Sequence, residues 1–97
     1  MFSLDLPEDF GDYEWEVTAK GCFLEARLVV SGIRYRLNFF DASRLTQEIV
    51  DELENGNAFF EANLVVVHSV TRQSMERAVE QLVQSGRVTL LMREATQ

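Results

Sequence analysis

Cysteine, histidine, proline and lysine are nearly absent from this chain, since each occurs only once. One cysteine cannot form an internal disulfide, and one cysteine with one histidine falls short of the three or four ligands of a zinc site. We therefore predict no disulfide, no metal and no cofactor. Cys22 lies in an apolar alternation, so we interpret it as a buried, inert thiol.

Long hydrophobic runs are also missing. The longest covers residues 64–67, whereas a helix needs about 18 to 20 apolar residues to span a bilayer. The first residues, 1–5, carry no basic charge and contain an acid, the opposite of a secretory signal. We therefore expect a soluble, cytoplasmic protein with no membrane partner.

Positive charge is scarce, with nine basic against sixteen acidic residues and a net charge of −7. A protein of this charge repels nucleic acid at long range and attracts basic surfaces. The composition therefore disfavours DNA or RNA as a partner and favours a protein partner, especially a basic one.

The length of 97 residues and the hydrophobic content of 46% fit one domain with one core. We assign residues 1–97 to a single domain, with an acidic N-terminal arm over 1–12 and a globular core over 13–94. The arm alternates apolar residues with acids, so it can pack on its own domain or on a partner. Its acids are Asp5, Glu8, Asp9 and Asp12.

A β-hairpin is the clearest local pattern. Residues 22–30 and 33–40 both alternate apolar and polar side chains, and Ser31-Gly32 between them suits a two-residue turn. One register brings the apolar faces together. Its predicted pairs are Val30 with Ile33, Leu28 with Tyr35, Ala26 with Leu37, and Leu24 with Phe39.

Five further segments have weaker signals. Alternation from Tyr13 to Val17 predicts a strand, and a 3.6-residue period after Asp41 predicts a helix ending at Asn55-Gly56. Residues 58–68 are aromatic and β-branched, which favours a strand. A second helix is predicted from the Thr71 cap to Ser85-Gly86, followed by a last strand over 87–94.

The predicted fold is therefore α+β, with a mixed five-stranded sheet in the order β-β-β-α-β-α-β. Polar residues on one face of the hairpin indicate that no helix covers that face. We predict a two-layer sandwich with two helices packed on the other face.

The uncovered face of the hairpin is the candidate interaction surface. The alternation places Arg27, Arg34 and Arg36 together there, beside the cross-strand pair Phe23 and Phe40. Arginine with aromatic residues is a composition that interfaces favour. The alternative is that acids neutralise the arginines across the sheet. The acids considered are Glu14, Glu16 and Glu25.

Catalytic patterns are weak. His68-Ser69 is the one place where a base and a nucleophile are adjacent, but neighbouring strand residues point to opposite faces, so they are not placed as a dyad. The glycines are isolated, and the carboxylates lie in polar surroundings that do not shift a pKa. The sequence therefore favours a protein without catalytic activity.

Three functional hypotheses remain. The first is an acidic protein-interaction or regulatory domain of inhibitor or immunity type, forming a homodimer through the sheet because Val65 and Val67 need cover. The second is a small-molecule or enzymatic site between sheet and helices, using His68, Tyr35 or an arginine. The third is single-stranded RNA stacking on the aromatic residues of the open sheet face.

Overall fold

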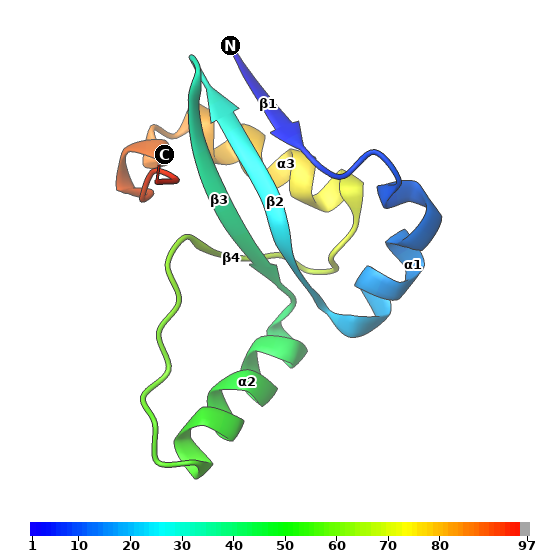
Figure 1. Cartoon of the computed structure of the whole chain (residues 1–97), viewed down its shortest axis with the longest axis vertical. Helices are drawn as coiled ribbons and strands as arrows, with labels where there is room; N and C mark the ends of the chain where they lie inside the picture. Colours follow the sequence, from blue (N-terminus) through cyan, green and yellow to red (C-terminus); the bar gives the residue numbers. More distant parts are fainter. Residues whose placement is uncertain (96–97) are drawn as a thin grey trace.

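The elements follow the order β-α-β-β-α-β-α in a computed structural model that describes residues 1–95 (Figure 1). The strands are β1 (Phe2–Asp5), β2 (Cys22–Val30), β3 (Ile33–Phe40) and β4 (Leu64–Val66). The helices are α1 (Phe10–Lys20), α2 (Ala42–Glu54), α3 (Arg72–Gln84) and the short 3₁₀ helix η1 (Arg87–Leu90). The α+β class is confirmed, whereas the predicted five strands and their order are wrong for the described residues.

The sheet is mixed, as predicted, with the spatial order β1-β2-β3-β4. β1 and β3 flank β2 in antiparallel directions, and β4 runs parallel to β3. The hairpin turn uses Ser31 and Gly32 with φ of 50° and 81°, the left-handed region that two-residue hairpins require. Three predicted pairs are confirmed: Val30 with Ile33, Leu28 with Tyr35, and Ala26 with Leu37.

The hairpin departs from its predicted register near the start of β2. The pairing shifts between Phe23 and Ala26, so that Phe23 lies opposite Phe39. An extra residue in one strand reverses the sides to which the following side chains point. Phe23 is therefore 5% exposed and Leu24 37% exposed. The predicted pairing of Leu24 with Phe39 is wrong.

The strand predicted from Tyr13 to Val17 is part of α1. Tyr13 and Val17 are four residues apart, and side chains at this spacing share a face both in a strand and in a helix. Helical spacing also buries Phe10, whose ring centroid lies 5.6 Å from that of Tyr13 and 5.1 Å from that of Phe23. Trp15, which a strand would place beside Tyr13 and Val17, is 70% exposed.

The predicted N-terminal arm belongs to the sheet and the core. Residues 2–5 form β1, with Phe2 opposite Val30 and Leu4 opposite Leu28. Leu4 and Leu6 pack against the core, and Phe10 is fully buried. The arm therefore packs on its own domain, and β1 is an edge strand beside β2.

The two C-terminal strand predictions also need correction. Of residues 58–68, the structure places only Leu64–Val66 in a strand, directly after Asn63 with its φ of 52°. Residues 87–94 form no strand. The 3₁₀ helix η1 occupies Arg87–Leu90 after the left-handed Gly86, and the backbone N–H of Met92 donates to the side chain of Asn63.

The helices that pack against the core on one face of the sheet are α1 and α3. α3 lies behind the strands in Figure 1. The core joins Val17 of α1 and Met75 and Val79 of α3 to the inward side chains of β2 and β3. The pair of helices on this face is not the predicted pair, because α2 projects away from the end of the sheet (Figure 1). The inward strand residues are Phe23, Ala26, Leu28, Tyr35, Leu37 and Phe39.

A pair of truncations in α1 tests this packing. Phe10→Ala should lower the free energy of unfolding by about 3 to 5 kcal/mol, because it removes a fully buried ring. Trp15→Ala should change it by less than about 0.5 kcal/mol, because the indole is exposed. Urea denaturation measures both. A loss for Trp15→Ala as large as that for Phe10→Ala would contradict the exposure of the indole.

Candidate functional site

The three arginines of the predicted surface lie on one face of the hairpin. Arg27 on β2 lies opposite Arg36 on β3, and Arg34 lies two residues before Arg36 on the same strand. The residues between them in sequence, such as Leu28 and Tyr35, are buried on the opposite face. The cluster predicted from the alternation therefore exists as a geometric feature.

Two of these arginines are paired with carboxylates that the sequence did not indicate. Arg27 Nε donates to both carboxylate oxygens of Glu94, at 3.0 and 2.9 Å. Arg34 lies 3.6 Å from Glu94 and 3.8 Å from Asp5. The neutralising acids are not the predicted Glu25, Glu14 and Glu16; Glu14 accepts instead from the backbone N–H of Arg72 at 2.8 Å.

The C-terminal segment brings Glu94 to this face. The backbone N–H of Glu94 donates to the carbonyl of Arg34 at 2.8 Å. Asn63 bridges the same segment to β3, because its amide nitrogen donates to the carbonyls of Arg36 and Met92, each at 2.8 Å. The arginine face is therefore partly covered by the chain's own residues.

Neither aromatic residue of the predicted surface is available to a partner. Phe23 is 5% exposed in the core, and Phe40 is 3% exposed. Arg36, the third arginine, donates from Nε to the carbonyl of Leu24 at 2.8 Å. The predicted aromatic rim is wrong, and with it the RNA hypothesis loses its stacking residues.

The acids predicted in the N-terminal arm do not form one cluster with a defined partner. Asp5 faces Arg34 at the edge of the sheet. Glu8, Asp9 and Asp12 are exposed around the turn from β1 into α1. Burial, together with Asp9 and Glu25, raises the pKa of the Tyr13 phenol above its ordinary value, so Tyr13 stays neutral near pH 7.

The histidine and the cysteine show no reactive arrangement. His68 is exposed at the end of β4, and within residues 1–95 no hydrogen bond joins it to Ser69 or Ser74. Cys22 is buried and unbonded. Over the same residues, no group of three or more potential ligands could hold a metal ion.

α2 packs little of its surface against the rest of the fold. Its apolar side chains recur with helical spacing, yet none of its residues is buried. Val50 is 43% exposed and Leu53 60% exposed, while Leu45 and Ile49 are half-buried. We refer to these four residues as the α2 stripe. Within the described chain, no other helix or strand packs closely along α2.

The base of α2 is held firmly. The side chain of Asp41 caps the helix, because it accepts from the backbone N–H of Arg44 at 2.7 Å. The backbone N–H of Asp41 also donates to the carbonyl of Gly21 at 2.8 Å. Gly21 has φ +84°, and a Cβ there would lie 2.8 Å from Cβ of Arg44. This close approach fixes the direction in which α2 leaves the domain.

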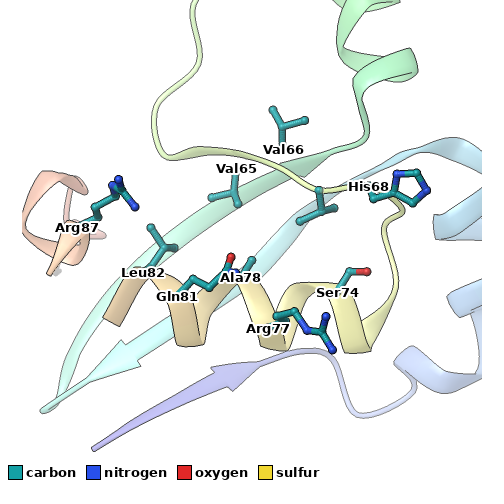
Figure 2. Close-up of a pocket in the computed structure, with 10 residues that line it drawn as sticks. Val65, Val66, His68, Ser74, Arg77, Ala78, Gln81, Leu82 and Arg87 are labelled. Carbon is teal, nitrogen blue, oxygen red and sulfur yellow. The ribbon is translucent and has the colours of Figure 1, made fainter. Parts of the chain in front are cut away.

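A groove of about 410 Å³ lies between β4 and α3 (Figure 2). Val65 and Leu82 face each other across it, with Arg87 at one end and His68 at the other (Figure 2). Arg77 also lines the groove. Among the described residues, neither Arg77 nor Arg87 forms an ion pair, and no acid lines the groove.

Comparisons with protein-family models, with curated proteins and with solved structures found no match for this chain. None of the helices within residues 1–95 has the length and apolar content needed to cross a membrane. The α2 stripe and the β4–α3 groove are therefore the features from which a function must be argued.

Two glycine substitutions test how firmly the base of α2 is held. Gly21→Ala should lower the free energy of unfolding by more than about 2 kcal/mol, because an L side chain resists positive φ and its Cβ would meet Asp41 and Arg44. Gly86→Ala is the matched control, with φ +76° and nothing within 4 Å of the added Cβ. It should cost only about 1 kcal/mol. Equal losses in urea denaturation would show that the contact at Gly21 is not close.

Proposed function

We propose that this chain is a non-catalytic protein-interaction domain that docks through α2. The observation that carries the proposal is the uncovered α2 stripe, on a helix that buries none of its residues. A helix of 13 residues is marginal in water by itself, because most helical stability in proteins comes from packing an apolar face. A partner that covers the stripe would supply that packing.

The overall shape supports this role for α2. The radius of gyration is 13.8 Å and the longest dimension 42 Å, whereas a compact domain of this length has a radius of gyration of about 12.5 Å. The projecting α2 accounts for the extension in Figure 1. Phe60, in the segment that returns from α2 to β4, is 86% exposed and adds apolar surface to the same end of the molecule.

The charge of α2 favours a basic surface on the partner. The helix carries four acids against Arg44, and Arg44 is already paired with Glu48 at 3.2 Å. Helical spacing places Glu52 beside Leu45 on one border of the stripe and Glu54 beside Val50 on the other. An apolar stripe with acidic borders fits an apolar groove with cationic borders.

A second candidate function uses the β4–α3 groove for a small molecule. Its volume of about 410 Å³ and its mixture of valines with Arg77, Arg87 and His68 suit a small anionic ligand with an apolar part. A thermal-shift screen of metabolites distinguishes the two proposals. A ligand that stabilises the parent chain but not Arg77→Ala would favour this second function, and no hit would remove it.

Substitution in the stripe tests the interaction proposal. Leu53→Glu should leave the free energy of unfolding within about 0.5 kcal/mol of the parent, because Leu53 is 60% exposed. It should weaken partner binding by about tenfold or more, because a charge then faces an apolar contact. The measurement is quantitative recovery of bound proteins from cell extract by the immobilised chain.

Trp15→Glu is the matched control, since Trp15 is 70% exposed on α1 and the same charge is introduced away from α2. The control should recover the same protein as the parent chain. Recovery of that protein by Leu53→Glu at the parent level would overturn the proposal that α2 is the docking element.

A further inference from the structure

We infer that the surface that receives α2 is the β4–α3 groove of a second copy of this chain. The inference rests on the proposed function and gives its partner. It joins two features that have no counterpart within one molecule, an apolar helix without a groove and an apolar groove without an occupant. Both are present in every copy of the chain, so two molecules can satisfy each other.

The apolar surfaces correspond in kind. The α2 stripe presents branched aliphatic side chains. The groove offers Val65 from β4 and Ala78 and Leu82 from α3 (Figure 2), together with Val67, which directly follows β4. Val66 at the rim is 48% exposed. Helix-in-groove recognition uses this combination, with anchors one helical turn apart entering an apolar trough.

The charges are opposite in sign. Arg77 and Arg87 line the groove, and none of the acids among residues 1–95 does. The α2 stripe is bordered by Glu52 and Glu54, and the helix as a whole carries a net charge of −3, from four acids and one arginine. Docking would give the two unpaired arginines acidic neighbours while the stripe is removed from water.

α2 cannot reach the groove of its own molecule in this arrangement. The start of α2 is fixed, because the backbone N–H of Asp41, directly before the helix, donates to the carbonyl of Gly21. The segment 55–63 leaves from the other end of the helix. From that base the helix extends away from the sheet, whereas the groove lies behind β4 against α3 (Figures 1 and 2). A second molecule removes this restriction.

Reciprocal docking gives a closed dimer. If α2 of each protomer enters the groove of the other, the contact is duplicated around a two-fold axis and no α2 or groove is left over. Duplication also doubles the buried area relative to a single helix in a single groove, which favours a stable assembly.

The competing arrangement is pairing of two copies through the open edge of β4. The carbonyl of Asn63 and the N–H of Val67 form hydrogen bonds with β3. Backbone groups of alternate residues in a strand point to opposite sides, so those of Leu64 and Val66 face the open edge. β4 has only three residues, which offers few hydrogen bonds to a second strand. Strand pairing would also leave the α2 stripe uncovered.

The test is the mass of the purified chain by sedimentation over a concentration series. The parent chain should be a dimer. Leu53→Glu, and separately the double variant Arg77→Glu with Arg87→Glu, should weaken dimerisation by about tenfold or more. Arg93→Glu, an exposed change of the same charge outside the groove, should leave it unchanged. Circular dichroism should show that each variant is folded.

Mixing the variants gives the sharpest outcome. Leu53→Glu retains an intact groove and the double arginine variant retains an intact stripe, so an equimolar mixture should form a one-to-one heterodimer with one working contact. Raising salt from about 0.1 M to about 1 M, which shortens the Debye length from about 10 Å to about 3 Å, should weaken the parent dimer. A mixture in which neither variant associates would overturn reciprocal docking.

The remaining outcomes separate this inference from the proposed function. A parent chain that stays monomeric at every concentration overturns the inference. If the parent chain then recovers another protein from the extract and Leu53→Glu does not, α2 is still the docking element. A dimer unaffected by the arginine changes also overturns the inference and points to the β4 edge. If Leu53→Glu alters neither the mass nor the recovered proteins, both proposals fail.

Discussion

The contact of Gly21 with Asp41 sets the position of α2, and the functional argument depends on it. The carbonyl of Gly21 accepts from the backbone N–H of Asp41 at 2.8 Å, directly before the helix begins. The same Asp41 caps α2 through its side chain. Because the turn from α1 to β2 is packed against the start of α2, the helix leaves the end of the sheet and does not fold back over it. The stripe on α2 is exposed for this reason.

Local patterns predicted the hairpin and both of the helices that the sequence indicated. The hairpin has one register in which the apolar residues of both strands face the same side, and the turn at Ser31-Gly32 agrees with it. The predicted cap Thr71 accepts from the backbone N–H of Ser74, three residues ahead. The arginine face followed from the same alternation.

Features that depend on distant contacts could not be predicted. A strand and a helix both explain Tyr13 and Val17, and only the burial of Phe10 against Phe23 decides for α1. The irregularity after Phe23 has no sequence signal, yet it moves Phe23 from the surface into the core. Glu94 lies 67 residues from Arg27, so no local pattern could pair them. The groove depends on how β4 and α3 pack, and its residues were predicted only as parts of separate elements.

The sheet, α1 and α3 form one core, whereas α2 buries none of its residues. We propose that a partner covers α2. The most direct test of that claim is hydrogen exchange of the α2 amides as a function of protein concentration. If α2 docks on a second copy, its amides should exchange quickly in dilute solution, where the helix is marginal without packing. They should become protected as the dimer forms. Exchange of α2 that is equally slow at every concentration would contradict the account.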